Sequence, residues 1–448
     1  MENNALINIF KAYDIRGKVG SELTPQFVKE IGQAFADWLP SEGVVAVGRD
    51  MRPDSAELAQ AFITGLRSQG RDVMDIGEVT SDMIYFAVGK YDLAGGAVVT
   101  ASHNPGEYNG IKLYRDKVTA VGLDSGLAEI RDLALKKSFK QVATKGTCEP
   151  KDITEDWVTH CLTFVTGLKP FHIAIDAGNG MAGAILPHIL PKLPLTVEEM
   201  YFELDGTFPN HEANPQKLEN LQDLVQKVTS QRLDFGVAFD GDGDRAVLVD
   251  DKGRPVQGSD FISLVAKLYL DKYPGSRIVH DVRTSRATQE LIKEWGGQPV
   301  RVKAGRVFIG AELRKIGAPF GGETTGHLFF QENFDADSGL IAALVAMQAL
   351  SASGKKLSDL VDEYRRYVMI PEMNIETAKQ PGSIFAKLKE TFADGRQDEL
   401  DGLTVWYDDY WFNLRASNTE PVMRLNAEAK TKAELDNLVA KITGLIAK

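Results

Sequence analysis

The sequence predicts an α/β protein with three successive similar α/β units that contain mixed sheets, followed by a smaller C-terminal α+β domain. Three observations support this fold class. The 448 residues are enough for about three domains of roughly 150 residues each, short apolar runs alternate with helical patterns, and this alternation changes after about residue 371. Such alternation is typical of βαβ units. We expect domain boundaries that give residues 1–148, 149–250, 251–366 and 367–448.

The first unit is predicted from two strands and a helix between them. The strands cover residues 43–48 and 96–100, and the helix begins near Ser55 and ends before Gly70. One face of this helix is apolar and carries Leu58, Ala61, Phe62 and Leu66. The pattern breaks around residues 145–152, where the second unit begins.

The later units show the same alternation until the C-terminal domain. The second unit has predicted strands over residues 172–176, 234–239 and 246–250. The third has a helix from Ser259, a strand over 277–282, a helix over 285–295 closed by Gly296 and Gly297, and a strand over 300–303. The C-terminal domain has a helix over 384–392, an aromatic strand pair over 403–414 and a helix from Lys432. Repeated units of this kind indicate a repeated architecture.

Composition and charge argue against several classes of protein. Hydrophobic residues make up 43% and charged residues 25%, and no run of 18 apolar residues is present, so we expect a soluble protein. The formal net charge of −12 repels nucleic acid and anionic membranes, and we expect neither as a partner. Cys148 and Cys161 are too few for a disulfide scaffold. The N-terminus lacks the pattern of a signal peptide, so we expect a cytoplasmic protein.

A serine lies in a loop that follows the predicted strand 96–100. Residues 100–105 read TASHNP, with Ser102 at the carboxyl end of the strand, where open α/β sheets present ligand-binding groups. Ser, Asn and Pro also form ordinary turns. A hydrolase nucleophile elbow needs glycine two residues on either side of the serine, but Thr100 and Asn104 stand there.

Three aspartates alternate with glycines between two apolar strands. Asp240, Asp242 and Asp244 can converge on one hard cation, because glycine permits the tight backbone that this requires. The spacing differs from an EF-hand, which would have Gly where Arg245 stands and Glu where Asp251 stands. We therefore predict a Mg²⁺ site with Arg245 beside it to bind phosphate, rather than a solvated acidic turn.

Two further loops carry polar groups suited to a sugar phosphate. Residues 321–327 read GGETTGH and offer a carboxylate, hydroxyls and an imidazole that can bind sugar hydroxyls. Residues 415–421 read RASNTEP and resemble a phosphate cradle. An ordinary loop and a capped turn are the respective alternatives.

Residues 178–183 read GNGMAG and match the GxGxxG spacing of dinucleotide-binding enzymes. Glu198 and Glu199 follow about twenty residues later, as that fingerprint requires. A dehydrogenase is therefore the alternative from another enzyme class. The motif does not explain the serine loop or the three aspartates, and we interpret it as a tight strand-to-helix turn.

Taken together, the motifs resemble the α-D-phosphohexomutase superfamily, and specifically its phosphomannomutase/phosphoglucomutase branch. Five motifs occur in the order of that family, namely residues 12–17 (AYDIRG), 100–105, 240–245, 322–327 and 415–421. The resemblance implies four domains around a central cleft. It also implies interconversion of hexose 1-phosphate and hexose 6-phosphate, of glucose or mannose, through a phosphoserine at Ser102 and a hexose 1,6-bisphosphate intermediate.

The resemblance also implies a role for each matching residue. Mg²⁺ would be held by Asp240, Asp242, Asp244 and the phosphoserine. Catalytic groups would be Ser102, His103, Arg16, Lys112 and Arg245, and the proton carrier is left open among Lys112, Arg16 and His327. Substrate would be bound by Tyr13, Arg283, Arg306, Glu323, Thr325, His327, Arg415, Ser417, Asn418 and Thr419. We expect a monomer whose only partners are sugar phosphates.

The chain departs from the family pattern at three places. Arg306 stands where many relatives have histidine, Arg283 where relatives often have lysine, and Thr324-Thr325 where a serine is more common. These differences leave the sugar open, and a phosphoglucosamine mutase is the nearest alternative. A haloacid-dehalogenase-type phosphotransferase with Asp240 as nucleophile, and a sugar-phosphate-binding protein without turnover, are more distant alternatives.

Overall fold

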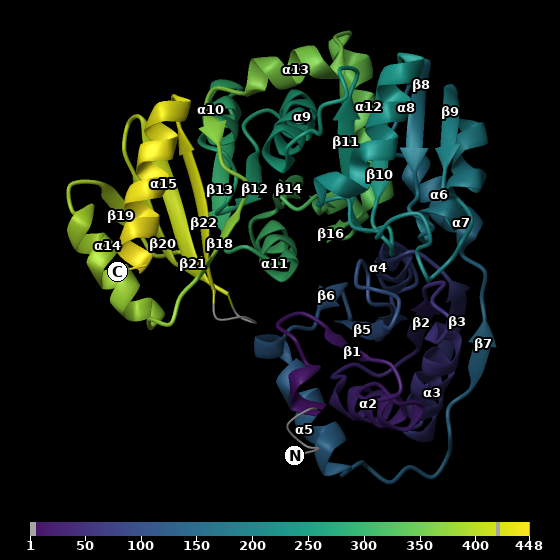
Figure 1. Ribbon diagram of the computed structural model, residues 1–448. Coiled ribbons are helices and arrows are strands. Elements are labelled where there is room, and N and C mark those ends of the chain that lie inside the picture. The colour runs from purple at the N-terminus through teal and green to yellow at the C-terminus, as the bar shows by residue number, and fades with distance from the viewer. Residues whose placement is uncertain (1–5, 418–421, 448) are drawn as a thin grey trace.

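The computed structural model describes residues 6–417 and 422–447, and within them the strands form four successive sheets (Figure 1). The predicted fold class is confirmed. The units follow one another around an arc, so that the C-terminal unit, in yellow, and the second unit, in teal, lie on opposite sides of the view. Among the described residues, no helix is both long and apolar enough to span a membrane.

The first unit has a mixed sheet with helices on both faces. Its strands are β1 (Ile15–Lys18), β2 (Val45–Arg49), β3 (Val73–Glu78), β4 (Gly95–Val99), β5 (Tyr108–Arg115), β6 (Thr119–Ala120) and β7 (Cys148–Pro150). Its helices are α2 (Pro25–Trp38), α3 (Ser55–Ser68), α4 (Ser81–Lys90) and α5 (Leu127–Lys136). Val45 and Val47 pack with α2 and α3, whereas Ala46 packs with α4, because successive side chains of a strand point to opposite faces.

The second unit has the sheet order β11-β10-β8-β9. Its elements are α6 (Thr154–Leu162), β8 (Phe171–Asp176), α7 (Ala182–Ile189), β9 (Leu195–Met200), α8 (Gln222–Gln231), β10 (Phe235–Phe239) and β11 (Ala246–Asp250). Because β10 and β11 are antiparallel and paired through Phe239 and Ala246, residues 240–245 form the hairpin loop between them.

The third unit has the sheet order β13-β12-β14-β15-β16. Its strands are β12 (Arg277–Asp281), β13 (Gln298–Val302), β14 (Phe320–Gly322), β15 (Leu328–Phe330) and β16 (Ala336–Asp337). Its helices are α9 (Gly258–Lys272), α10 (Arg286–Glu294), α11 (Arg306–Ile316), α12 (Gly339–Ser353) and α13 (Leu357–Tyr364). The predicted strands and helices of the first three units lie within a few residues of the observed ones.

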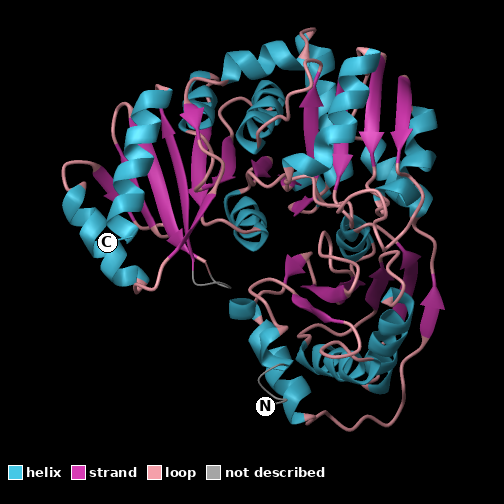
Figure 2. Cartoon of the chain, in the orientation of Figure 1, coloured by secondary structure: helices cyan, strands magenta, loops and turns pink. Residues whose placement is uncertain are grey.

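The C-terminal unit is a sheet covered by two helices (Figure 2). Its strands are β17 (Val368–Met369), β18 (Met373–Glu376), β19 (Arg396–Asp398), β20 (Leu403–Trp406), β21 (Tyr410–Ala416) and β22 (Val422–Ala429). The helices α14 (Pro381–Thr391) and α15 (Lys432–Ala447) pack against it. The strands pair antiparallel throughout, as expected for a unit that differs from the first three.

Two features blur the boundaries between the units. β7 pairs with β3, so the first sheet continues to Pro150, beyond the expected boundary at residue 148. Helix α12 is buried along almost its whole length, because it packs on α9 of its own unit and on β11 and α6 of the second unit. One hydrophobic core therefore runs through the first three units, while the C-terminal unit has a separate core.

Candidate active site

Loops after neighbouring parallel strands bring several polar side chains to one edge of the first sheet. Strands β3 and β4 both run parallel to β2, so their carboxyl ends lie at the same edge. Arg52 follows β2, Ser81 follows β3 and Ser102 follows β4. This is the edge at which α/β sheets present ligand-binding groups.

Ser102 is buried beside residues 240–245 of the second unit, which we call the aspartate loop. It is 3% exposed, and its backbone has φ +53°, which few residues other than glycine adopt. Its N–H donates to Thr100 Oγ1 at 2.9 Å, and its hydroxyl donates to Asp240 Oδ2 at 3.0 Å. Gly241 permits this approach, because a Cβ there would lie 2.4 Å from the carbonyl oxygen of Ser102. The structure thus brings Ser102 next to the aspartate loop, as the resemblance to the family implies.

Arg52 holds the serine loop, a role that the sequence analysis missed. Its side chain is 1% exposed, and Nε donates to Asp50 Oδ2 at 3.2 Å. Its two terminal nitrogens donate to the backbone carbonyls of Ser102 (3.0 Å), Asn104 (2.6 Å), Pro105 (2.9 Å) and Tyr108 (2.9 Å). The sequence places Arg52 just after a predicted strand, and this position could have indicated a residue of the site.

We expect the Arg52→Met substitution to loosen the serine loop, because it removes four hydrogen bonds to the loop and leaves Asp50 buried without its cation. The local free energy of opening of residues 101–108 should fall by about 3–5 kcal/mol. Native-state hydrogen exchange measures this quantity. The control is Arg131→Met, whose arginine is half-buried and pairs with the neighbouring Asp132, away from the serine loop. Unchanged protection of residues 101–108 in Arg52→Met would contradict the assignment.

The three aspartates of the hairpin loop are fully buried and lie together. Oxygens of Asp240, Asp242 and Asp244 fall within 4.8 Å of one another. Lys112 of β5 donates to Asp242 Oδ2 at 2.6 Å and also pairs with Asp244, and Arg245 Nε donates to Asp240 Oδ2 at 2.8 Å. With Arg306 Nη1 3.7 Å from Asp244 Oδ2, three carboxylates therefore face three cationic side chains.

The donor set fits a hard divalent cation. Burial raises the pKa of Asp240 to about 6 even though Arg245 opposes the shift. Burial would also raise the pKa of Asp242, but Lys112 and the hydroxyl of Ser81 lower it. The Oδ1 atoms of Asp242 and Asp244 are buried without a hydrogen-bond partner among the described residues. Clustered carboxylate oxygens of this kind are the ligands that Mg²⁺ prefers.

Cationic and imidazole groups surround the serine hydroxyl. His103 Nδ1 lies 3.1 Å from Ser102 Oγ and accepts from Arg245 Nη2 at 2.6 Å. Burial and Arg245 lower the pKa of His103, so its imidazole is neutral and can accept that hydrogen bond. Arg16 Nη1 donates to Asn104 Oδ1 at 2.6 Å, which places β1 against the same loop.

The N-terminus of α4 contacts the aspartate loop and was also missed. The Ser81 N–H donates to the carbonyl oxygen of Asp242 at 2.9 Å, and its hydroxyl donates to Asp242 Oδ2. Asp82, next to it, accepts a 2.5 Å hydrogen bond from Ser338 of the third unit. The run Thr80-Ser81-Asp82 is typical of a helix start, which gives no sign of these partners.

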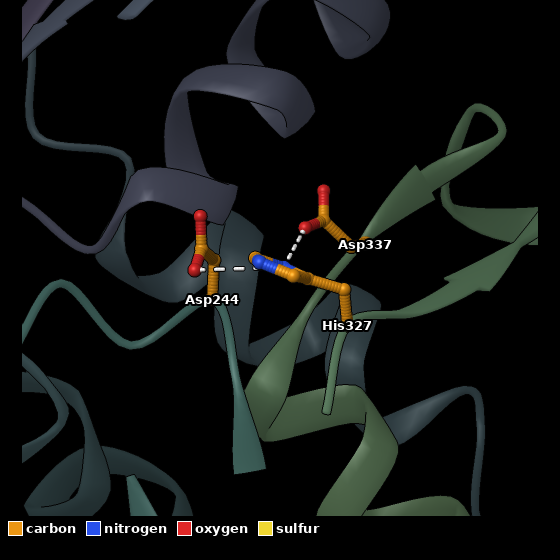
Figure 3. A group of neighbouring side chains, drawn as sticks. All are labelled: Asp244, His327 and Asp337. Carbon is orange, nitrogen blue, oxygen red and sulfur yellow. Dashed lines mark hydrogen bonds and ion pairs between the residues drawn. The ribbon is translucent and has the colours of Figure 1, made fainter. Parts of the chain in front are cut away.

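His327 faces the aspartate loop from the third unit. Figure 3 shows its ring between Asp337 and Asp244, with Nδ1 2.6 Å from Asp337 Oδ2 and 3.7 Å from Asp244 Oδ1. Burial alone would lower the pKa of His327, but these two carboxylates raise it. Asp337 lies on β16, next to β15, and no sequence pattern singled it out.

Arginines and carboxylates line the third unit beside His327. Arg283 Nη2 donates to Asp281 Oδ2 at 2.7 Å and to Glu323 Oε1 at 2.6 Å, which joins the loops after β12 and β14. Thr325 accepts at its carbonyl oxygen from Gln216, and its buried Oγ1 has no hydrogen-bond partner among the described residues. The predicted sugar loop lies next to the aspartate loop, because a Cβ on Gly326 would lie 3.7 Å from Arg245 Cβ.

Comparisons with known proteins match this architecture along the chain. The four domain models of phosphoglucomutase/phosphomannomutase match in order, the α/β/α domains I, II and III at residues 8–141, 155–253 and 257–367 and the C-terminal domain at residues 372–445. The chain belongs to the phosphoglucomutase/phosphomannomutase family. This family lies in the α-D-phosphohexomutase superfamily, and the chain is an enzyme that transfers phosphate.

Named relatives and a solved structure agree with membership of the family. The chain is 38% identical to a protein of Xanthomonas campestris named phosphohexose mutases, over 95% of this chain and 96% of the relative. It is 37% identical to a phosphomannomutase of Vibrio cholerae, with 99% of both chains covered. A phosphoglucomutase/phosphomannomutase family protein of Burkholderia thailandensis superposes with a TM-score of 0.91 at 32% identity, covering 98% of this chain and 96% of that one.

In this member of the family, Arg306 lies close to Asp244 of the aspartate loop. Its Nη1 donates to Tyr85 OH at 2.7 Å and lies 3.7 Å from Asp244 Oδ2. Its guanidinium carbon lies 5.4 Å from the ring centroid of Tyr114. Arg306 and Tyr13 both line a cavity of about 260 Å³ between the first and third units, which Ser102 and the three aspartates do not line. Phosphate binding by Arg306 stays a prediction.

The predicted phosphate loop of the phosphoglucomutase/phosphomannomutase C-terminal domain is described in part. Arg415 lies at the end of β21 and donates from Nη2 to Glu372 Oε2 at 2.6 Å. The Ser417 N–H donates to the carbonyl oxygen of Val422 at 2.9 Å, which closes the base of the loop. Asn418 and Thr419 lie outside the described residues.

Proposed function

We propose that this enzyme interconverts hexose 1-phosphate and hexose 6-phosphate, of glucose or mannose, through a phosphoserine at Ser102 and a hexose 1,6-bisphosphate. The observation that carries the proposal is the position of the Ser102 hydroxyl, 3.0 Å from Asp240 within a buried cluster of three aspartates, Lys112 and Arg245. A hydroxyl in that position can carry a phosphoryl group next to a cation site.

The proposed reaction has two phosphoryl transfers. In the first, the bond between phosphorus and Ser102 Oγ breaks while a bond forms to the free hydroxyl of the hexose phosphate, giving the bisphosphate. After the bisphosphate reorients, its other phosphoryl group returns to Ser102. Mg²⁺, held by Asp240, Asp242 and Asp244, would neutralise charge on the transferring group. Arg245 and Arg16 contact His103 and Asn104 of the serine loop, where they can stabilise the phosphoryl oxygens.

The geometry favours His327 as the proton carrier among the three candidates. Lys112 Nζ donates to Asp242, Asp244 and Ser81, so all three of its hydrogens are engaged. Arg16 is a permanent cation. His327 has an imidazole held by Asp337 at 2.6 Å, an arrangement that orients a histidine for proton transfer. We therefore propose that His327 accepts the proton that the reacting hydroxyl releases.

The remaining groups would recognise the substrate. In this proposal Glu323, Thr325 and His327 bind sugar hydroxyls. Tyr13, Arg283 and Arg306 also contact the substrate. Arg415, Ser417, Asn418 and Thr419 would hold the phosphate that does not react. The arginine forks suit phosphate oxygens because a guanidinium can donate two parallel hydrogen bonds. We further propose that the enzyme is a monomer that binds neither nucleic acid nor membranes.

The proposal is tested by comparing kcat/KM for glucose 1-phosphate, mannose 1-phosphate and glucosamine 1-phosphate with Mg²⁺ and catalytic hexose 1,6-bisphosphate. We expect turnover of glucose and mannose phosphates, with glucose preferred, and glucosamine 1-phosphate slower by about tenfold or more. Removal of the metal with EDTA should stop turnover, and Mg²⁺ should restore it. Preference for glucosamine 1-phosphate would instead assign the alternative mutase, and no turnover of any of the three would contradict the proposal.

A further inference from the structure

The segment that joins β9 to the helical turn Leu218–Leu221 touches the active-site loops of three units. Residues 201–217, which we call the connecting segment, form neither a helix nor a strand. The segment belongs to the second unit, yet it contacts Arg52 of the first unit, which binds the serine loop, and the sugar loop of the third unit. A segment with contacts of this kind can hold the three loops in fixed relation.

Its contact with the serine loop is made through Arg52. The ring of Phe208 lies against the Arg52 guanidinium, with 5.0 Å between the guanidinium carbon and the ring centroid. Gly206 packs on the backbone of the same residue, because a Cβ on Gly206 would lie only 2.5 Å from Arg52 Cα. The connecting segment therefore covers the residue whose guanidinium binds four carbonyl oxygens of residues 102–108.

Its contacts with the other two loops are hydrogen bonds. The N–H of Gly241, in the aspartate loop, donates to the carbonyl oxygen of Ala213 at 3.2 Å. Gln216 Nε2 donates to the carbonyl oxygen of Thr325, in the sugar loop, at 2.9 Å. Phe208, Ala213 and Gln216 thus contact Arg52, the aspartate loop and the sugar loop respectively.

The glycine-rich turn at residues 178–181 anchors the connecting segment, which gives that turn a structural purpose. Asn179 Nδ2 donates to the carbonyl oxygen of Glu203 at 2.9 Å, and its Oδ1 accepts from Asn210 at 2.7 Å. Backbone hydrogen bonds join Asn179 to Tyr201 and Asp205. Tyr201 and Phe208 have φ +56° and +53°, values that bulky residues keep only where surrounding contacts impose them.

We propose that the connecting segment is a positioning element for phosphoryl transfer, in which Phe208 fixes the serine loop through Arg52 and Gln216 fixes the sugar loop through Thr325. This inference rests on the proposed function and adds two positioning residues to it. Neither side chain is proposed to touch substrate. The two contacts reach different loops, so their loss should alter different kinetic constants.

The test compares Phe208→Ala and Gln216→Ala in the full chain. In Phe208→Ala we expect the rate of Ser102 phosphorylation by glucose 1,6-bisphosphate, followed by intact mass in a single turnover, to fall about tenfold, with KM for glucose 1-phosphate within twofold of wild type. In Gln216→Ala, an exposed side chain, we expect KM to rise about fivefold and kcat to stay within twofold. Phe208→Tyr should keep the wild-type rate, and Leu204→Ala, exposed on the same segment, is the matched control.

Hydrogen exchange without substrate separates this inference from the proposed function. Exchange of residues 101–108 should be faster in Phe208→Ala, and exchange of residues 323–327 faster in Gln216→Ala, whether or not the enzyme turns over sugar phosphates. Wild-type exchange at both loops would overturn the inference. The inference would also be overturned if both variants lost kcat and gained KM to the same extent, since that result indicates only general destabilisation. Failure of the wild-type enzyme to isomerise hexose phosphates would overturn the proposed function and leave the exchange result to decide this one.

Discussion

In the Ser102→Ala variant we expect mutase activity to fall by about 10⁴-fold or more while sugar-phosphate binding stays within about threefold. The variant keeps the backbone of the serine loop, whose carbonyls remain bound by Arg52, and it removes only the hydroxyl that would carry the phosphoryl group. Turnover with a coupled assay and binding by calorimetry measure the two effects separately. The exposed residue Ser230 provides the matched control, because its hydroxyl donates to the carbonyl oxygen of Lys227 in its own helix.

Mass spectrometry extends this test to the intermediate. After incubation with glucose 1,6-bisphosphate and Mg²⁺, the wild-type chain should gain about 80 Da at Ser102, and the variant should gain nothing. A phosphoserine resists hydroxylamine, whereas an acyl phosphate on Asp240 would be cleaved by it. Turnover at the wild-type rate in Ser102→Ala, or an adduct labile to hydroxylamine, would remove Ser102 from the mechanism.

In the Asp242→Asn variant we expect Mg²⁺ affinity and kcat each to fall by about 100-fold. The substitution keeps the size of the side chain but replaces one carboxylate oxygen by an amide NH2 group, which removes one of three buried negative charges and the charge partner of Lys112. The two carboxylates that remain already pair with Arg245, Lys112 and Arg306, so less negative charge is left to bind a divalent cation. Titration with Mn²⁺, followed by electron paramagnetic resonance, measures metal binding without any need for turnover.

An exposed carboxylate supplies the control for that experiment. Asp271 pairs with Lys267 on the surface of α9, and Asp271→Asn should bind Mn²⁺ as the wild-type enzyme does. Wild-type Mn²⁺ affinity in Asp242→Asn would show that the cation binds elsewhere. Loss of affinity with unchanged kcat would show instead that the cation does not take part in phosphoryl transfer.

Sequence patterns predicted the strands and the loops after them better than they predicted the partners of each side chain. Apolar runs place β4, β10 and β11 within about one residue of their observed limits, because burial on both faces leaves a strong pattern. The serine loop and the aspartate loop follow from those strands. Resemblance to the family then predicted that Ser102 and Asp240 act together, and the structure places their side chains 3.0 Å apart.

The residues that were missed lie in contacts between units. Arg52, Ser81 and Asp337 have partners that are distant in sequence or on another strand, and no local pattern encodes such partners. Arg306 shows that identifying a residue in the sequence does not reveal its contacts. The sequence identified it as a departure from relatives, but its contacts with the rings of Tyr85 and Tyr114 depend on how the first and third units pack. Local periodicity therefore locates a loop, while tertiary packing decides which of its side chains act.

Helix α12 has a consequence for how the chain can be divided. Because this helix contributes to the apolar interior of both the second and the third unit, cutting the chain between them would expose Leu340, Leu344 and Met347 to water. The first three units should then behave as one cooperative folding block, and none of them is a natural fragment for separate expression. The C-terminal unit has its own interior, and polar contacts such as Ser285 with Glu428 and Arg301 with Asp398 join it to the third unit. Removing it would break these polar contacts but would leave the apolar core shared by the first three units intact.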